Sequence, residues 1–264
     1  MSSCGPGARL NKDILQSLLS FKRPLVPYAH PIYSVRSARV MAQEMLFRFK
    51  DDNGEMLTVG TIFSDATIPY EQKVSLDMLC LDAAFKLLSE TVLVDRMHFI
   101  NLEPSTLAHP DFWTHLPRWV GGLEVNPGQV VVEFTESHSL HRLDELQVYA
   151  KRLRDHGLKI AVDDLGAGVA SLTHMARLAP DFIKADRSLV EQVHRRPYQA
   201  ALLNALAHFA EHMRVGFIAE GVELYEELIA VMDADVPWVQ GFVYGRPEPI
   251  LDLEAAIKAA QSKG

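Results

Sequence analysis

The chain has 264 residues, of which 48% are hydrophobic and 23% are charged, and its formal net charge is -8 at pH 7. This composition is typical of a globular protein with a sizeable core, and the negative charge argues against binding to nucleic acid polymers or to an anionic membrane. The two cysteines, Cys4 and Cys80, form no disulfide framework. The first residues lack the apolar core of a signal peptide, and no apolar run reaches the length of a membrane span. We therefore expect a cytoplasmic protein.

Two strands joined as a hairpin are predicted near the N-terminus, at residues 23–35 and 40–49, after a partly disordered or helical lead over residues 1–22. Alternating apolar segments predict further strands at residues 98–102, 130–136, 159–162, 181–186, 215–220 and 238–242. Helical periodicity and terminal signals predict helices at residues 74–88, 110–120, 140–156, 171–178, 198–212, 224–232 and 251–261.

This alternation of strands and helices continues without a linker and predicts a single α/β domain over residues 23–264. The number of repeats favours a modified TIM (β/α)8 barrel. A doubly wound sheet fits less well, because no glycine-rich nucleotide loop follows the first strand. The hairpin at the start would make the first barrel strand antiparallel.

Polar residues recur at the ends of the predicted strands, where a barrel forms its active-site face. They are Glu44, Asn101, Glu133, Asp163, Asp164, Lys184, Glu220 and Gln240. Any one of them alone would more commonly be a cap or a surface group, and an isolated Asp-Asp pair is commonly an acidic turn. Their repetition along successive strands predicts one polar cup.

The two adjacent acids need a turn to reach the same space. Asp163 shares a face of its strand with Ala161, whereas Asp164 starts on the opposite face. The glycines at Gly166 and Gly168 allow a tight loop that would turn Asp164 inward. Two neighbouring carboxylates repel each other unless they are solvated, share a proton or bind a cation.

The residue types in the cup indicate divalent cations. Carboxylates and an Asn amide are hard oxygen ligands that suit Mg²⁺ or Mn²⁺ better than Zn²⁺, and so many acids favour two ions over one. A two-metal site activates a water for attack on a phosphodiester, and Lys184 with Arg48 supplies positive charge for such a substrate. A glycosidase, the competing hypothesis, would need only two carboxylates and an aromatic-rich cleft.

Seven motifs in this order resemble those of the EAL domain family of cyclic di-GMP phosphodiesterases, over residues 28–249. They are Glu-Met-Leu at residues 44–46, Asn-Leu at 101–102, Glu-Phe-Thr-Glu-Ser at 133–137, Asp-Asp-Leu-Gly-Ala-Gly at 163–168, Ile-Lys-Ala-Asp at 183–186, Ala-Glu-Gly-Val-Glu at 219–223 and Val-Gln-Gly at 239–241. The resemblance implies hydrolysis of cyclic di-GMP to linear pGpG by two Mg²⁺ or Mn²⁺ ions, in a homodimer. We expect a stand-alone domain without an attached sensor, whose regulatory input would come from a regulatory protein partner, from its expression level, or not at all.

The resemblance also implies a role for each matching residue. Lys184 would orient the attacking water, Glu220 would help to remove its proton, and Arg48 would bind a substrate phosphate. Gln240 would bind the substrate and support the site, Glu223 would support the site, and Glu136 would anchor the loop after Asp164. The metal ligands would be Glu44, which is also expected to be catalytic, and Asn101, Glu133, Asp163, Asp164 and Glu220.

The chain departs from the family pattern at three places. Leu165, Ala167, Val169 and Ala170 replace residues that are usually Phe, Thr, Tyr and Ser, His30 replaces a usual Gln, and residues 57–71 lack the usual Phe-Ile-x-x-Ala-Glu motif. Three hypotheses follow: an active phosphodiesterase, which the complete ligand set favours; a cyclic di-GMP receptor without turnover; and a protein-binding module. Hydrolysis and binding assays distinguish them.

Overall fold

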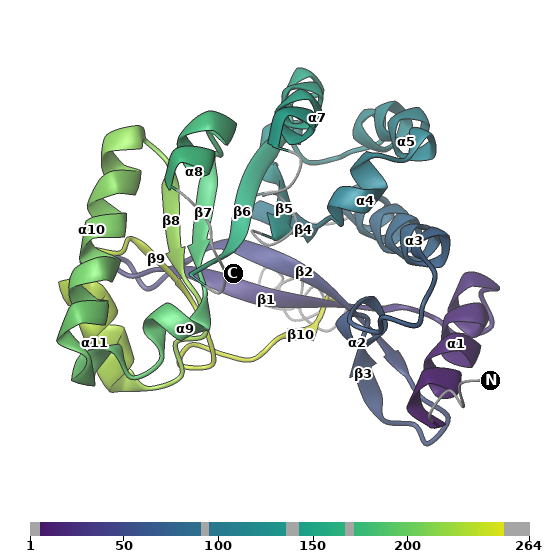
Figure 1. The fold of residues 1–264 in the computed structure, drawn as a ribbon, viewed down its shortest axis with the longest axis horizontal. Helices are drawn as coiled ribbons and strands as arrows, with labels where there is room; N and C mark the ends of the chain where they lie inside the picture. The colour runs from purple at the N-terminus through teal and green to yellow at the C-terminus, as the bar shows by residue number, and fades with distance from the viewer. Residues whose placement is uncertain (1–5, 91–94, 136–142, 167–171, 251–264) are drawn as a thin grey trace, which may run out of the picture.

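The computed structural model describes residues 6–90, 95–135, 143–166 and 172–250. Its centre is a closed barrel in which the strand order returns to the start through a pairing of β1 with β2 (Figure 1). The barrel strands are β1 (Val26–Ser34), β2 (Val40–Lys50), β4 (Met97–Asn101), β5 (Val130–Thr135), β6 (Lys159–Leu165), β7 (Phe182–Ala185), β8 (Gly216–Ala219) and β9 (Trp238–Gln240). The predicted TIM-like barrel is confirmed.

The first strand is antiparallel to both of its barrel neighbours. β1 pairs with β2 over eight positions from Val26↔Arg48 to Tyr33↔Val40, and with β9 from Ile32↔Gln240 to Ser34↔Trp238. All other barrel pairs are parallel. This arrangement confirms the predicted hairpin and the antiparallel first strand.

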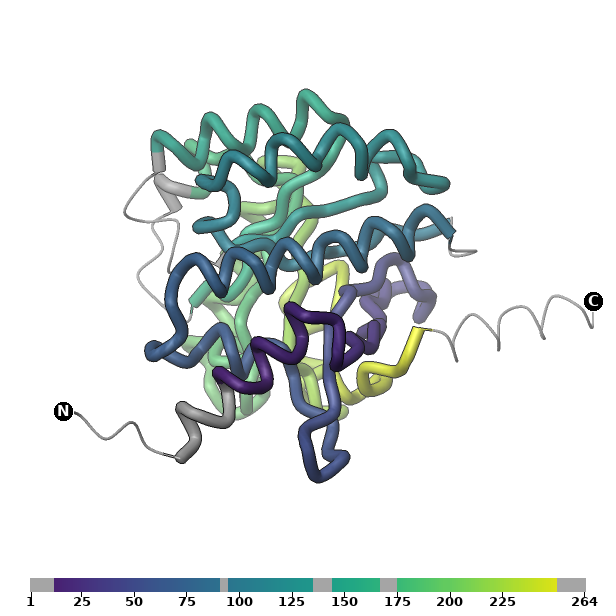
Figure 2. Tube along the Cα trace, turned by 90° about the vertical axis from the view of Figure 1, so that its right-hand side faces the viewer, coloured from purple at the N-terminus to yellow at the C-terminus, as the bar shows by residue number. Residues whose placement is uncertain are grey.

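Helices surround the barrel, since their apolar faces cover the outer faces of the strands (Figures 1 and 2). The predicted helices that lie within the described residues correspond to α3 (Tyr70–Leu88), α5 (Pro110–Gly121), α7 (Leu143–Asp155), α8 (Leu172–Leu178), α10 (Pro197–Met213) and α11 (Tyr225–Asp233). Short helical segments not anticipated from the sequence are α2 (Gly60–Phe63), α4 (Pro104–Leu107), α9 (Arg187–Val190) and the two 3-10 turns, η1 (Pro127–Gln129) and η2 (Val193–Arg195). The expected terminal helix at 251–261 lies outside the described residues.

A second, smaller core lies beside the barrel. Helix α1 (Pro6–Leu19) buries Ile14, Leu15 and Leu18 against a cluster that includes Phe49 of β2 and Ile62 of α2. Strand β3 (Met56–Thr58) extends the sheet from β2, and this hairpin projects from the body of the molecule in Figure 2. The sequence predicted neither β3 nor the two-residue strand β10 (Glu248–Pro249), which pairs with β1.

The closed end of the barrel interior is filled by apolar side chains. This layer contains Ile32, Ala42, Phe99, Val131, Ala161, Phe182 and Ile218, one from each of seven strands, with Trp238 of β9 packed against it. Because side chains alternate along a strand, the residues two positions further on point into the barrel again and form the next layer. Among the described residues, no helix is both long enough and apolar enough to cross a membrane.

Candidate active site

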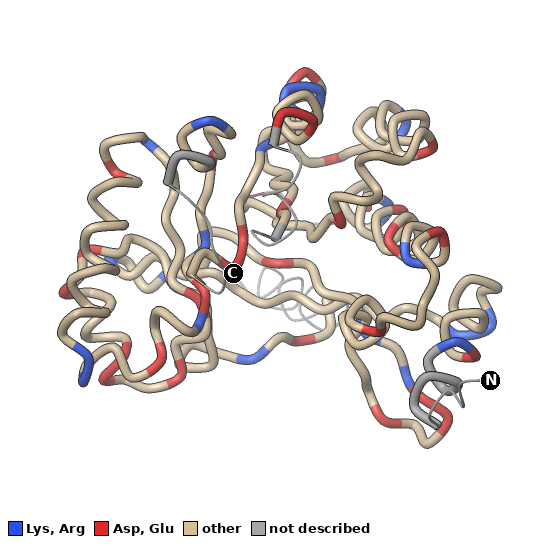
Figure 3. Tube along the Cα trace, viewed as in Figure 1, with Lys and Arg blue, Asp and Glu red and all other residues tan. Residues whose placement is uncertain are grey.

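The layer of inward-pointing side chains next to this apolar layer, which we call the apolar plug, is polar. Each of its members lies two residues from a plug residue: Glu44 follows Ala42, for example, and Glu133 follows Val131. Acidic positions therefore occur on the central strands as well as on the outer helices (Figure 3). The polar layer consists of His30, Glu44, Asn101, Glu133, Asp163, Lys184, Glu220 and Gln240.

Lys184 lies at the centre of this layer and is only 1% exposed. Its Nζ lies 2.5 Å from a carboxylate oxygen of Glu220 and 2.8 Å from one of Glu133. It also lies 3.6 Å from Asp163 and 3.8 Å from Glu44. A buried ammonium is stable only when its charge is compensated, and four carboxylates compensate this one.

Glu44 is held by two amides. Asn101 Nδ2 donates to one carboxylate oxygen of Glu44 over 2.8 Å, and Gln240 Nε2 donates to the other over 2.8 Å. Burial opposes the charged form of Glu44, but Lys184 and these two hydrogen bonds outweigh burial and lower its pKa. Glu44 is therefore an ionised carboxylate whose orientation is fixed by the two amides.

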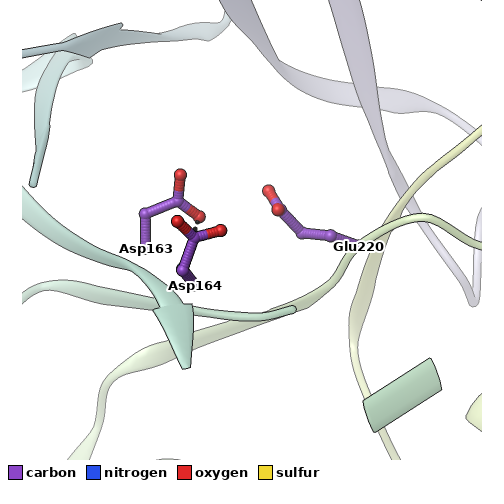
Figure 4. Close-up of side chains that lie close together, drawn as sticks. All are labelled: Asp163, Asp164 and Glu220. Carbon is purple, nitrogen blue, oxygen red and sulfur yellow. Dashed lines mark hydrogen bonds between the residues drawn. The ribbon is translucent and has the colours of Figure 1, made fainter. Parts of the chain in front are cut away.

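Asp164 reaches the cup through an unusual backbone conformation. Its φ is +60°, in the left-handed region that Asp and Asn tolerate better than most residues, and its N–H donates to Asp163 Oδ1 over 2.9 Å. In Figure 4 the carboxylates of Asp163 and Asp164 lie side by side, and the carboxylate of Glu220 lies opposite them across the cup. One carboxylate oxygen from each of the three residues lies within 4.8 Å of the others, so the loop turns Asp164 inward as predicted.

The acids carry more negative charge than Lys184 compensates. Burial, reinforced by the neighbouring carboxylates, raises the pKa of both Glu133 and Glu220 well above the usual value. Burial and the charge of Asp163 raise the pKa of Asp164 to about 6. Glu133 Oε2 is buried without a hydrogen-bond partner among the described residues, whereas Glu133 Oε1 and Glu220 Oε1 face Lys184 Nζ. Glu133 Oε2 thus remains free to bind a cation.

A close approach of two loops fixes Gln240. A Cβ at Gly241 would lie 2.1 Å from the carbonyl oxygen of Val222, so only glycine fits there. Val222 N donates to the carbonyl of Gln240 over 3.2 Å, and Val243 N donates to Val222 O over 3.1 Å. The Val-Gln-Gly motif therefore joins the end of β9 to the loop that follows Glu220.

Glu223 lies outside the cup. Its side chain, about a third exposed, forms an ion pair with Arg187 of α9, which lowers the pKa of Glu223. Sequence reasoning missed the acid that organises this loop, the buried Glu227 of α11. Glu227 accepts the backbone N–H groups of Gln192, Glu223 and Leu224 at 2.9–3.1 Å. The sequence feature that could have identified Glu227 is its place in the first turn of a predicted helix, where a Glu side chain can accept backbone N–H groups at the helix start.

Arg48 lies further along the same face of β2 as Glu44. Its guanidinium lies 4.3 Å from the centroid of the Tyr28 ring, and its Nε is buried without a hydrogen-bond partner in the part of the chain that the structure describes. Arg48 lines a pocket of about 460 Å³ that reaches the polar layer at Glu44, Asn101 and Glu133. An arginine free to bind an anion thus stands beside the cup.

The same pocket contains a second residue that sequence reasoning missed. Asp77 of α3 is 4% exposed and accepts the backbone N–H of Glu103 over 3.0 Å. Burial raises the pKa of Asp77 to about 7. The sequence feature that could have identified Asp77 is an acidic residue within an otherwise apolar stretch of the predicted helix. Glu136 and residues 167–171 of the altered loop lie outside the described residues.

Comparison with known proteins places the chain among proteins of this architecture. The profile of the EAL domain matches residues 12–247. The cyclic di-GMP phosphodiesterase PdeF of Escherichia coli is 25% identical over 85% of this chain and 30% of its own length. The blue light- and temperature-regulated antirepressor BluF of the same organism is 30% identical over 82% of this chain and 53% of its own length. The chain thus spans about half, or less, of these relatives.

Solved structures agree with the sequence comparison. The PaMucR phosphodiesterase in its c-di-GMP complex superposes with a TM-score of 0.79 at 24% identity, covering 93% of this chain and 99% of that one. Klebsiella pneumoniae BlrP1 in a manganese/cy-diGMP complex superposes with a TM-score of 0.76 at 30% identity, covering 85% of this chain and 56% of that one. With a family profile that spans most of its length, the chain belongs to the EAL domain family.

Proposed function

We propose that this chain hydrolyses cyclic di-GMP to linear pGpG with two divalent cations, Mg²⁺ or Mn²⁺. The observation that carries the proposal is the cup itself, in which four carboxylates lie within 3.8 Å of the buried ammonium of Lys184. Asp164 adds a fifth carboxylate beside Asp163 and Glu220, and the Asn101 amide contacts Glu44. The relatives support the substrate, since PdeF is named a cyclic di-GMP phosphodiesterase and BlrP1 is described in a manganese/cy-diGMP complex.

The donor set fits the proposed ions in type and in charge. All of the donors are oxygens, which Mg²⁺ and Mn²⁺ prefer. With all five acids ionised, one ammonium leaves four uncompensated negative charges, which equals the charge of two divalent cations. When bound, the ions would activate water as a nucleophile and stabilise the charge of the phosphodiester. The residues that would hold them are Glu44, Asn101, Glu133, Asp163, Asp164 and Glu220.

Lys184 and Glu220 would divide the handling of the attacking water. Burial alone would lower the pKa of Lys184, but the four carboxylates outweigh it and raise that pKa well above the ordinary value. A lysine that stays protonated donates hydrogen bonds and cannot act as a base, so Lys184 orients the water. Glu220, whose pKa burial raises, is the better acceptor of the proton.

The remaining residues position the substrate and the ligands. Arg48 binds a phosphate oxygen, because its buried Nε lacks a partner among the residues described and its guanidinium is already ordered on Tyr28. Gln240 orients Glu44 through its 2.8 Å hydrogen bond. Glu223 acts through Arg187 on the loop after β8. We further expect a homodimer and a regulatory protein partner.

A second candidate function is protein binding without turnover. Two observations favour it: the relative BluF, at 30% identity, is named an antirepressor, and Leu165 departs from the usual aromatic residue of the loop that follows the metal-binding acids. A receptor that binds cyclic di-GMP without hydrolysing it is a separate alternative, which the altered Leu165 also favours.

Product analysis separates these functions. Purified protein is incubated with cyclic di-GMP and Mg²⁺ or Mn²⁺, with EDTA and with Asp163→Asn as controls, and the products are resolved by chromatography. Metal-dependent pGpG that both controls lack is the expected result. Binding of cyclic di-GMP by calorimetry without any pGpG would identify a receptor, and no binding would favour a protein-binding module.

A further inference from the structure

The loop after β8 carries Glu220 into the cup, but it has no regular secondary structure of its own. Residues 220–224 lie between β8 and α11, so their backbone groups bond to other segments of the chain. Glu220 N donates to Ala185 O over 3.0 Å. Gly221 has a φ of +66° and packs against Arg187, where a Cβ would lie 2.7 Å from the Arg187 Cβ. The conformation of this loop therefore decides where the Glu220 carboxylate lies.

Glu227 holds the other end of this loop and is 3% exposed. Its Oε2 accepts the N–H groups of Glu223 and Leu224 over 3.0 and 3.1 Å. Its Oε1 accepts the N–H of Gln192, in the turn after α9, over 2.9 Å. Burial alone would raise the pKa of Glu227, but these hydrogen bonds outweigh burial and lower that pKa. One buried carboxylate thus joins the loop after β8 to the turn after α9.

A second interaction restrains the same end of the loop, but more weakly. Glu223 forms an ion pair with Arg187, and the two side chains are 34% and 44% exposed. Ion pairs with this much exposure contribute little, because water screens the charges. Hydrogen bonds from backbone N–H groups to a buried carboxylate are charge-assisted and stronger. Glu227 therefore supplies most of the restraint on this end of the loop.

Two of the proposed metal ligands depend on the position of this loop. Glu220 is part of the loop, and its carboxylate lies across the cup from the two adjacent aspartates (Figure 4). Val222 N donates to the backbone carbonyl of Gln240 over 3.2 Å, and the Gln240 side chain holds Glu44 by a 2.8 Å hydrogen bond. A displacement of the loop would therefore move ligands on two sides of the cup.

We infer that Glu227 is a positioning residue, which sets the place of Glu220 and, through Gln240, of Glu44 before the cations bind. This inference rests on the proposed function, because the ligands are those that the proposal assigns. Groups that orient metal ligands typically contribute about 10- to 100-fold to metal affinity or activity. Glu227→Gln keeps the size of the side chain but turns one acceptor oxygen into a donor that faces a backbone N–H. We expect it to weaken Mn²⁺ binding by about 10-fold or more.

Calorimetry of Mn²⁺ binding to the full chain compares wild type, Glu227→Gln and a matched control, Asp181→Asn. Asp181 precedes β7, at the end of the barrel away from the cup, and its Oδ2 accepts the Ile160 N–H over 3.0 Å. Both substitutions thus convert a carboxylate that accepts a backbone N–H into an amide. Asp181→Asn should leave the Kd for Mn²⁺ unchanged. The kcat of Glu227→Gln for cyclic di-GMP should fall and should partly recover as Mn²⁺ is raised, which a loss of stability alone would not produce.

Hydrogen exchange measured by NMR on wild type provides a test that does not require the variant to fold. The N–H groups of Gln192, Glu223 and Leu224 should exchange slowly in EDTA as well as in Mn²⁺, because Glu227 already holds them before the cations bind. Fast exchange of these three groups in EDTA, followed by protection in Mn²⁺, would show that the cations order the loop and would contradict the inference.

The binding data also separate this inference from the proposed function. An unchanged Kd for Mn²⁺ in Glu227→Gln, or an equal loss of affinity in Asp181→Asn, contradicts the inference and leaves the proposed phosphodiesterase intact. Mn²⁺ binding that depends on Glu227, in a wild type that forms no pGpG, supports the inference and contradicts the proposed function. A wild type that binds no Mn²⁺ contradicts both.

Discussion

Replacing Asp164 by Asn should make the metal-free protein more stable, although it removes a proposed ligand. The substitution leaves the backbone undisturbed, because Asn tolerates the φ of +60° as well as Asp does. Burial and Asp163 raise the pKa of Asp164 from 3.8 to about 6, which corresponds to about 3 kcal/mol of cost for the ionised form. Asp164 is partly exposed, so solvent screening reduces this to about 1–2 kcal/mol.

The sign of the effect depends on pH. An acid whose folded pKa is raised binds its proton more tightly in the folded state, so its stabilising contribution is complete below pH 3.8 and is lost as the pH rises through about 6. The advantage of Asp164→Asn should therefore be full at pH 8 and roughly half as large at pH 5. Adding Mn²⁺ should reverse the order, because wild type gains binding free energy that the variant lacks.

Urea denaturation followed by circular dichroism, in EDTA and in Mn²⁺, measures these differences. Asp235→Asn is the matched control, since Asp235 is exposed and has a similar φ of +58°; it should change stability in neither buffer. If Asp164→Asn is less stable than wild type in EDTA at pH 8, then burial and repulsion of the Asp164 carboxylate do not destabilise the metal-free protein.

Three further predictions follow from the same geometry. Lys184→Met should destabilise the metal-free protein by about 3 kcal/mol at pH 8, because it leaves buried carboxylates without their counter-ion. A urea midpoint equal to that of wild type would show that Lys184 does not stabilise these carboxylates. Gly241→Ala should cost at least about 2 kcal/mol, because the new Cβ meets the Val222 carbonyl. Gly121→Ala, where no atom lies within 4 Å of the new Cβ, should cost little, and melting temperatures compare the two. Mn²⁺ affinity, measured by calorimetry, should fall as the pH drops below about 6, because Asp164 must lose its proton to bind; a constant affinity between pH 5 and 8 would exclude Asp164 as a ligand.

The polar cup could be predicted from the sequence because it depends on local alternation. Glu133 and Lys184 follow apolar strand residues at a spacing of two, and the barrel brings such positions together whatever the loops do. The inward turn of Asp164 was predictable for a similar reason, since the glycines beside it allow a positive φ nearby.

Features that depend on distant pairing were not predictable. Strand β10 has only two residues, Glu248 and Pro249, and exists because β1 leaves an unpaired edge beyond β9. Strand β3 forms because β2 extends past the barrel. Asp77 finds its partner, the N–H of Glu103, in a segment 26 residues away. Neither local propensity nor periodicity carries information about such contacts.

The cup is proposed to bind two divalent cations and to use them to hydrolyse cyclic di-GMP. The decisive measurement is the rate of pGpG formation at increasing Mn²⁺, with the bound Mn²⁺ per chain counted by calorimetry under the same conditions. We expect two bound ions per chain, and turnover that appears only as the second site fills. Two bound ions without any pGpG, or hydrolysis that persists in EDTA, would contradict the claim.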